Sequence, residues 1–286
     1  MTANDIRNIA LLGHGGSGKT SLAEQMLFMT KGTDRLGRTA DGNTTCDYDA
    51  EEIKRQISIS LAFAPVNYKG VKINVMDAPG NFDFSGEALS AIRAAECAVL
   101  VGAAKDGLSV GMERSWKMLG KKPRMIFINR TDEDNSDYNA TFEALRARFG
   151  NKIAPLVVPI WDEGKKVTGI IDVLNKRAYE MQDQKRVEIE IPEGKDAVIE
   201  EFNNALKESV AETSEEFMDK FFSGEDFTYV EMIQGLRQGV RELSLFPVLC
   251  GSAVNCMGSL MLLDDIVDLL PNPMEGNYHK ATRQDG

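Results

Sequence analysis

A glycine-rich segment near the amino terminus has the residue types and spacing of a phosphate-binding loop. Its eight residues read G-H-G-G-S-G-K-T, which fits the pattern G-x-x-x-x-G-K-[ST]. Glycines let backbone N–H groups turn onto phosphate oxygens, while Lys19 reaches the β- and γ-phosphates and the Thr20 hydroxyl ligates Mg²⁺. The segment follows an apolar run and opens a helical pattern. We therefore predict a nucleotide phosphate site at Gly13, His14, Gly15, Gly16, Ser17, Gly18, Lys19, Thr20 and Ser21.

A second phosphate-contacting element is expected where an apolar run ends in a carboxylate. Asp77 closes the run Val71–Asp77 and is followed by Ala78, Pro79 and Gly80. A carboxylate in this place makes the second Mg²⁺ contact, usually through water, and the Gly80 N–H can meet a γ-phosphate. D-A-P-G alone is a common turn sequence, so this prediction depends on the phosphate loop upstream.

Two further segments favour guanine over adenine. Asp132 follows the apolar run Arg124–Asn129, and its carboxylate can accept hydrogen bonds from the N1–H and 2-amino groups that guanine offers and adenine lacks. Asn129 can brace this loop and contact the base, and the backbone of Ser252 and Ala253 can meet guanine O6. A solvated turn is the alternative at Asp132, because the residues after it are also polar.

The chain around these residues alternates between two kinds of pattern. Apolar runs predict strands, and they are separated by segments with helical periodicity. This alternation predicts an α/β fold with a mostly parallel sheet and helices on both faces. The strands are expected at Ile6–Leu12, Ile59–Tyr68, Val71–Asp77, Ala98–Ala103 and Arg124–Asn129, and the helices at Lys19–Thr30, Phe84–Ala95, Val110–Gly120 and Tyr138–Phe149.

The pattern changes after residue 151, where short strands precede a group of helices. We predict an inserted α+β subdomain at 152–244 between two parts of a nucleotide-binding domain, 1–151 and 245–272, and a linker at 273–286. The inserted strands are expected at Pro155–Trp161, Val167–Leu174, Arg177–Met181 and Arg186–Ile191. Helices are expected at Glu193–Thr213, Ser214–Phe222 and Thr228–Leu243, followed by a strand at Phe246–Cys250 and a helix at Leu260–Leu270.

Composition limits the function classes. The chain has 286 residues, a net charge of −11 and 43% hydrophobic residues, which is globular and argues against a broad basic surface for nucleic acid. No apolar stretch is long enough to span a membrane or to serve as a signal peptide. The four cysteines show no C-x-x-C spacing, so no zinc site or disulfide framework is expected, and a reducing cytoplasm fits best.

Taken in order, these elements resemble the translational GTPases, most closely elongation factor G. Residues 46–48 with 54–59 resemble the first switch of that family, residues 77–84 the second, and residues 127–132 the base-reading loop. The resemblance implies a GTPase domain with an insert, GTP or GDP and Mg²⁺ as cofactors, and Ser58 as a further Mg²⁺ ligand. It also implies further domains after residue 286, the ribosome as partner, and GTP hydrolysis that drives translocation. The acidic helices at 196–220 are then candidates for contact with the ribosomal stalk protein.

Several residues depart from that family's pattern. Asn81 stands where the family usually has the His that positions the attacking water, so the predicted catalytic set is Asn81, Lys19 and Gly80. Ser58 replaces a Thr but keeps the hydroxyl, and Arg130 replaces a Lys but can still stack on a base. Gln56 replaces a Gly, and Gly16 an Asp. These departures favour a diverged paralogue over the housekeeping factor.

Three other functions stay open on the sequence alone. A ribosomal protection factor that ejects a tetracycline-like antibiotic shares this domain. A switch that binds GTP with little hydrolysis is favoured by Asn81. A phosphate-loop kinase or ATPase is disfavoured by Asp132 and by the lack of a recognisable acceptor site.

Overall fold

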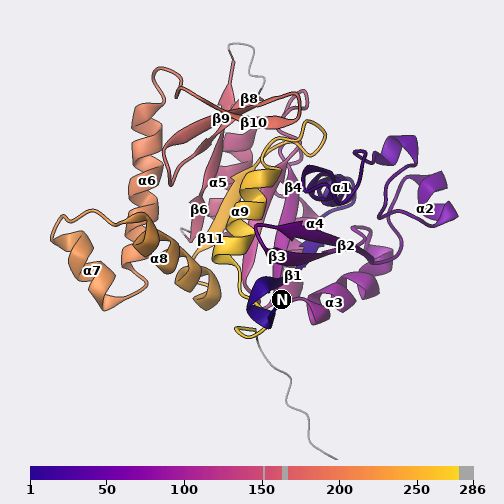
Figure 1. Cartoon of the computed structure of the whole chain (residues 1–286), viewed down its shortest axis with the longest axis horizontal. Helices are drawn as coiled ribbons and strands as arrows, with labels where there is room; N and C mark the ends of the chain where they lie inside the picture. Colours follow the sequence, from indigo (N-terminus) through magenta and orange to yellow (C-terminus); the bar gives the residue numbers. More distant parts are fainter. Residues whose placement is uncertain (151, 163–166, 277–286) are drawn as a thin grey trace, which may run out of the picture.

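A seven-stranded sheet forms the centre of the computed structural model, which describes residues 1–150, 152–162 and 167–276. The strand order is β2-β3-β1-β4-β5-β11-β6, and only the pair β2–β3 is antiparallel. The predicted α/β class is confirmed (Figure 1). Residues 277–286 of the predicted linker lie outside the described part. The strands are β1 (Ile6–Leu12), β2 (Ala62–Tyr68), β3 (Val71–Asp77), β4 (Cys97–Ala103), β5 (Arg124–Asn129), β6 (Ile153–Pro155) and β11 (Phe246–Cys250).

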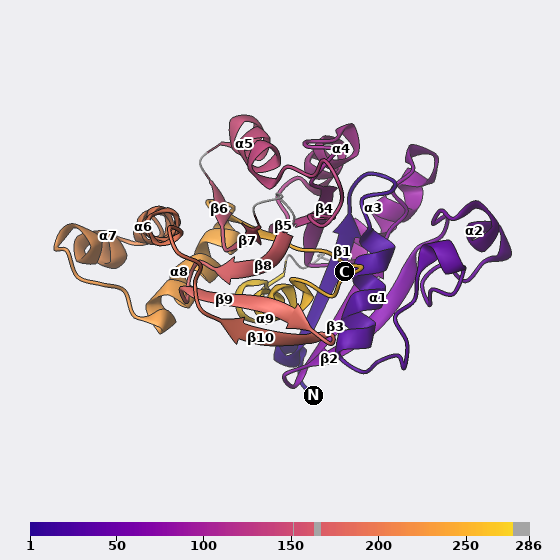
Figure 2. The ribbon, with the colours of Figure 1, turned by 90° about the horizontal axis from the view of Figure 1, so that it is seen from above.

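Helices cover both faces of this sheet (Figure 2). Helices α1 (Lys19–Met29) and α9 (Ser259–Leu269) lie side by side on one face. Helices α3 (Ser85–Ala94), α4 (Val110–Leu119) and α5 (Tyr138–Phe149) cover the other. The central strands β4 and β5 are buried along their whole length, as expected for parallel strands enclosed by helices. Short 3₁₀ turns, η1 (Ala3–Asp5), η2 (Thr39–Asp41) and η3 (Phe82–Phe84), occupy connections.

The first antiparallel hairpin is confirmed, but it is shorter than predicted. Lys69 and Gly70 both have positive φ angles, 48° and 80°, and form the two-residue turn between β2 and β3. Strand β2 begins at Ala62 rather than Ile59, because side chains take the N–H groups that a longer strand would use. Those of Ile59 and Ser60 donate to the Glu52 carboxylate, and that of Leu61 donates to Glu87.

One predicted strand is in fact two strands in different sheets. Within the predicted run Pro155–Trp161, β6 ends at Pro155 and pairs with β11, whereas β7 (Val157–Trp161) pairs with β8. Leu156 joins them: its N–H donates to Val248 O and its carbonyl accepts from Val173 N, each at 2.9 Å. A continuous apolar run does not reveal such a change of partner, because every residue in it except Trp161 is buried. The domain boundary at 152 stays a prediction.

The second sheet is antiparallel and lies over α9. Its order is β10-β9-β8-β7. Asp264 of α9 accepts hydrogen bonds from Tyr68 of β2 and Arg186 of β10, so α9 lies between the two sheets. The other members are β8 (Val167–Asp172), β9 (Arg177–Gln182) and β10 (Lys185–Ile189), followed by helices α6 (Asp196–Ala211), α7 (Glu215–Phe222) and α8 (Tyr229–Glu242). Helix α6 starts at Asp196, three residues after the predicted Glu193.

Two expectations from composition can be compared with the described residues. None of their helices is long and apolar enough to cross a membrane. All four cysteines are free and buried.

Candidate nucleotide-binding site

The phosphate loop connects the carboxyl end of β1 to the first residue of α1. Gly13, Gly16 and Gly18 have φ angles of 147°, 82° and 88°, which only glycine adopts without strain. At Gly13 a Cβ would lie 2.1 Å from the Val101 carbonyl oxygen of the neighbouring strand β4. The backbone conformation therefore requires glycine at the first and last glycine positions of the motif. The loop ends at the amino terminus of α1, and the dipole of this helix favours anions.

The side chain of Lys19 folds back into the phosphate loop. Its Nζ donates to the carbonyl oxygens of Gly13 (3.2 Å) and His14 (2.9 Å), and its side chain is buried. Burial lowers the pKa of this ammonium group, while Asp77 and Asp47 act in the opposite direction. The loop therefore holds a buried positive charge at the position where the motif calls for one.

Four oxygen-bearing side chains meet at the start of α1. The Thr20 hydroxyl donates to Asp77 Oδ2 at 2.6 Å and lies 3.0 Å from Ser58 Oγ. Ser58 Oγ in turn donates to Asp47 Oδ1 at 2.7 Å. The structure thus brings together the three predicted metal ligands, Thr20, Ser58 and Asp77, from three separate segments. It adds Asp47, which lies in the predicted first switch but has no predicted role there.

Two carboxylate oxygens of this cluster could still bind a metal ion. Asp77 Oδ1 and Asp47 Oδ2 are buried and lack hydrogen-bond partners. Burial raises the pKa of Asp77 to about 7, and the nearby Lys19 only partly opposes this. Hydroxyl and carboxylate oxygens are the donors that Mg²⁺ prefers, with water and phosphate completing its shell. No group of three or more His, Cys, Asp or Glu side chains suited to a metal occurs among the described residues, so the site fits Mg²⁺ held together with a phosphate rather than by protein alone.

The segment after Asp77 lies directly on the phosphate loop. A Cβ at Gly80 would be 2.5 Å from Lys19 Nζ and 2.6 Å from Gly15 N, so only glycine fits there. The next residue, Asn81, lines the same cavity and caps η3, accepting from Asp83 N at 3.2 Å. Beside it, the Phe82 ring lies 5.9 Å from the His14 ring and 4.7 Å from the Arg114 guanidinium carbon.

A cavity of about 480 Å³ joins these elements. It is lined by most of the predicted phosphate and metal residues together with residues 80–82 of the second switch. Thr39, Gln56 and Ile57 of the segment before β2 form its outer wall. The lining residues are His14, Gly15, Gly16, Gly18, Lys19, Thr20, Ser21, Thr39, Asp47, Gln56, Ile57, Ser58, Gly80, Asn81, Phe82 and Arg130.

Asn129 connects the phosphate loop to the two base-reading segments. Its Nδ2 donates to Ser17 O at 2.9 Å, and its Oδ1 accepts from Ala253 N at 3.0 Å. Ser252 N donates to Met257 O at 3.1 Å, which closes the turn after β11. Because both backbone N–H groups are engaged, a base that contacts Ala253 must share or replace the bond to Asn129. Asn129 thus links the phosphate loop to the turn after β11.

Asp132 is not among the residues that line the phosphate-loop cavity, and its carboxylate is held by a neighbouring side chain. Asn255 Nδ2 donates to Asp132 Oδ2 at 2.9 Å, which leaves Oδ1 for a ligand. Arg130 has a φ of 61° and pairs with Glu133, and it reaches the cavity described above. Asn255 is not among the site residues predicted from the sequence. The only sequence signal for it is its position three residues after Ser252. In the structure, the Ser252 hydroxyl accepts a hydrogen bond from Asn255 N.

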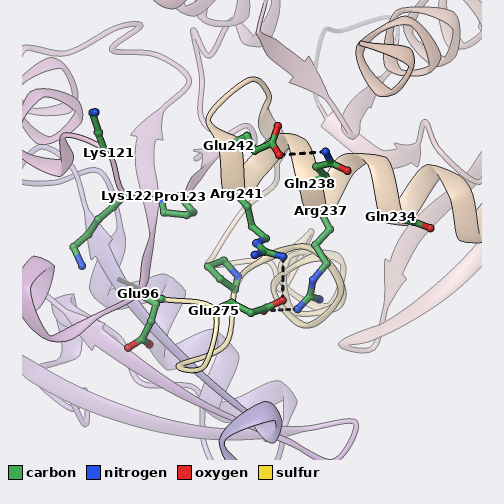
Figure 3. A pocket seen from close by; sticks show the side chains of 12 residues that line it. Glu96, Lys121, Lys122, Pro123, Gln234, Arg237, Gln238, Arg241, Glu242 and Glu275 are labelled. Atoms are coloured by element: carbon green, nitrogen blue, oxygen red, sulfur yellow. Dashed lines mark hydrogen bonds and ion pairs between the residues drawn. The ribbon is translucent and has the colours of Figure 1, made fainter. Parts of the chain in front are cut away.

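A second cavity, of about 450 Å³, lies at the opposite ends of the strands (Figure 3). Glu96 precedes β4 and Lys122 precedes β5, so this cavity is at the amino ends of strands whose carboxyl ends carry the nucleotide site. Arg237 and Arg241 of α8 both point to Glu275, which follows α9. None of the predicted site residues lines it.

Comparison with known proteins agrees with this geometry. The chain matches the model of the elongation factor Tu GTP binding domain over residues 4–272. It is also similar to the crystal structure of ttk003000868 from Thermus thermophilus, with 35% sequence identity and a TM-score of 0.90. The match covers 94% of this chain and 41% of the Thermus chain, so the present chain spans about two fifths of that relative. The chain belongs to the elongation factor Tu GTP-binding domain family and is a GTPase domain of the translation-factor type.

Proposed function

We propose that this chain is the GTP-binding part of an elongation-factor-G-type protein, which hydrolyses GTP on the ribosome to drive or modulate translocation. The observation that carries the proposal is the meeting of Thr20, Ser58 and Asp77 beside the phosphate loop. The separate antiparallel sheet with helices α6–α8 supports the assignment to elongation factor G, because the resemblance expects an insert there.

The nucleotide would be held at three places. Residues 13–21 would bind the phosphates, Asp132 would accept from the guanine N1–H and 2-amino groups, and Ala253 would contact O6. Thr20, Ser58, Asp77 and Asp47 would hold Mg²⁺, directly or through water. When bound, the ion neutralises charge on the β- and γ-phosphates.

Hydrolysis requires a group that orients water toward the γ-phosphate. Asn81 lines the cavity beside the Gly80 N–H, and its amide can both donate to and accept from water. It carries no positive charge, so Lys19 is the cation that this part of the chain supplies to the developing negative charge. We therefore expect slow turnover by the isolated protein.

The partners belong to the same proposal. The ribosome is the expected partner, and the acidic insert helices are candidates for the stalk protein. Phe222 at the end of α7 and Val230 at the start of α8 are 78% and 72% exposed, which places apolar contact area beside acidic side chains.

The test is GTP turnover by the full-length protein with and without ribosomes. Stimulation of at least about 100-fold is expected, because a positioned acid–base or water-orienting group contributes on the order of 10²–10⁴-fold. Asn81→Ala should remove most of this stimulation with GTP affinity unchanged, and Asn81→His should keep or raise it. Asp83→Ala, in the same turn, is the matched control. Tight GTP binding without any stimulation would contradict the proposal.

A second function is favoured by one hydrogen bond. Asn81 Oδ1 already accepts from Asp83 N, which occupies one of the two polar ends of its amide. A GTP-binding switch with little turnover would keep this bond. GTP binding that changes contact with ribosomes, with turnover unaffected by Asn81→Ala, would support the switch.

A further inference from the structure

Three charged side chains form an ion-pair network at the predicted base-reading loop. Arg130 Nε lies 3.1 Å from Glu133 Oε1, and Lys105 Nζ lies 2.9 Å from Glu133 Oε2. Lys105 follows β4, whereas Arg130 and Glu133 follow β5, so the network joins the connections after two neighbouring strands. Two cations share one carboxylate. The three side chains together therefore carry a net positive charge at the edge of a site for an anionic ligand.

Arg130 has a backbone conformation that a residue with a Cβ adopts only at a cost. Its φ of 61° lies in the left-handed region. The residues on either side hold it there: Asn129 O accepts from Ala104 N at 2.8 Å, and Thr131 donates to Gly251 O through both N (3.3 Å) and Oγ1 (3.1 Å). Strain of this kind at a residue other than glycine is concentrated at binding sites, so the conformation indicates a functional side chain.

The side chain of Arg130 reaches from the base-reading loop to the phosphate loop. It lines the same cavity as Gly18 and Lys19, and of the described residues 129–133 and 252–255 only Arg130 does so. The ion pair with Glu133 uses Nε, which leaves the two terminal NH₂ groups of the guanidinium for a ligand. A planar cation in this place can lie on the face of a base and donate to ribose or phosphate oxygens.

Partial burial makes the network stronger than an ordinary surface ion pair. The side chains of Arg130, Glu133 and Lys105 are 35%, 30% and 42% exposed, and Glu133 Oε2 is itself buried. Water and salt therefore screen the pair with Lys105 less than a fully exposed pair, whose contribution is usually small. Glu133 N also donates to Arg130 O at 3.3 Å, so a backbone turn keeps the two residues together. Without the Glu133 carboxylate, the long Arg130 side chain would regain its rotational freedom.

We propose that Glu133 is a positioning residue that, braced by Lys105, holds the Arg130 guanidinium over the bound nucleotide and so slows its release. The inference rests on the proposed function, because it takes a guanine nucleotide as the ligand. Arg130 is the group that touches the nucleotide, and Glu133 acts through it. The network belongs to the loop after β5 and not to the segments 56–58 and 77–84, which are predicted to face the γ-phosphate. We therefore expect GDP and GTP to be affected equally.

The rate at which a fluorescent GDP leaves the full-length protein measures this role without ribosomes or hydrolysis. Glu133→Gln keeps the size of the side chain but removes its charge, and it should speed the release of GDP and of a non-hydrolysable GTP analogue by about three- to fivefold. Lys105→Met should speed release by about twofold, because Arg130 keeps its partner. The matched control is Asp134→Asn, which removes the same charge from the exposed next residue. Release from Glu133→Gln that is no faster than from this control would overturn the proposal.

A double substitution separates positioning from structural support. Arg130→Ala should speed release by about tenfold, because it removes the group that touches the nucleotide. Adding Glu133→Gln to Arg130→Ala should change the rate by less than about 1.5-fold, since Glu133 acts through Arg130. Arg130→Lys should restore part of the loss, because a lysine keeps the charge but not the planar fork. An equal effect of Glu133→Gln with and without Arg130 would show a merely structural role and overturn the proposal.

The ribosome assay keeps this inference distinct from the proposed function. If nucleotide release follows the expected pattern but ribosomes do not stimulate GTP turnover, the proposed function fails and the role of Glu133 stands. If ribosomes stimulate turnover but release is the same for the wild type and Glu133→Gln, the role of Glu133 alone fails. A wild-type protein that binds no guanine nucleotide would overturn both.

Discussion

The carboxylate proposed to contact the base and the cluster proposed to hold the metal are each completed by a residue that has no motif of its own. Asn255 orients Asp132, and Asp47 accepts from Ser58. In both cases one oxygen is fixed by the protein and the other is left available, which is how a binding site keeps a carboxylate preorganised for its ligand.

Asp132→Asn should change the base preference of the site. The amide would offer a donor where guanine also has donors, and a hydrogen bond to a charged group contributes roughly 1.5–3 kcal/mol, so GTP affinity should fall by about 10–100-fold. Xanthosine triphosphate, with a carbonyl in place of the 2-amino group, should gain relative affinity. Competition binding measures both, with the neighbouring Asp134→Asn as control. Unchanged selectivity would contradict the role of Asp132.

Asp77 should make the stability of the ligand-free protein depend on pH. Burial raises the pKa of its carboxyl from 3.8 to about 7, so the folded state holds an extra proton in that window. The free energy of unfolding should therefore fall as the pH rises from 5 to 8 in the presence of a chelator. Asp77→Asn should reduce this fall by roughly 1–3 kcal/mol, since one pKa unit corresponds to about 1.4 kcal/mol and the window from pH 5 to 8 covers only part of the shift. The free energy of unfolding is measured in urea at both pH values. An equal fall with pH for the wild type and Asp77→Asn would contradict the assignment.

At the scale of elements, local signals were predictable and long-range partners were not. The phosphate loop and the turn at Lys69 and Gly70 depend on residues adjacent in the chain, so their sequences predicted them. Strand β6 has three residues and exists because it pairs with β11, far along the chain. Helix α2 (Ala50–Arg55) spans six residues, too short for a periodic pattern, although its Asp49–Glu52 capping box was a signal that could have revealed it.

The carboxyl end of helix α4 contacts a buried cation, Arg124. Replacing this residue should lower the free energy of unfolding. Arg124, 2% exposed, donates to the carbonyl oxygens of Trp116 (2.9 Å), Lys122 (3.0 Å) and Gly120, and its guanidinium carbon lies 4.5 Å from the Trp116 ring. Burial lowers the pKa of Arg124 to about 10, so it stays charged at neutral pH. Arg124→Met should lower the free energy of unfolding by roughly 2–4 kcal/mol, because it leaves those carbonyls unpaired. Lys117→Met on the exposed face of α4 is the control. If urea unfolding shows an equal loss of unfolding free energy for both variants, the role of Arg124 is contradicted.

At the scale of the whole molecule, charged side chains connect the two sheets. Asp264 of α9 forms ion pairs with Arg186 of β10 and with Lys69 of the β2–β3 turn. One turn further along α9, Arg237 of α8 donates to Asp268 O at 3.0 Å and to the Glu275 carboxylate at 2.6 Å. The middle and the carboxyl end of α9 are therefore tied to the part of the chain between β6 and β11.

Arg237→Ala should destabilise the whole molecule more than Arg241→Ala. Arg237 joins a helix carbonyl and a half-buried carboxylate, whereas Arg241 reaches Glu275 only at 3.5 Å and is half exposed. The expected losses in the free energy of unfolding are roughly 1–3 kcal/mol for Arg237 and under about 0.5 kcal/mol for Arg241. Urea unfolding monitored by circular dichroism compares them, and a larger loss for Arg241→Ala would contradict this arrangement.

The two covalent attachments of the antiparallel sheet and its helices lie next to each other. The chain leaves the main sheet at Leu156 and returns at Phe246, and Phe246 N donates to Lys152 O at 2.7 Å, beside the departing strand. A body attached by two adjacent points can tilt about them without stretching the backbone. Its angle is then set by the apolar core that it shares with the main sheet, together with side-chain contacts such as those of Asp264 and Arg237.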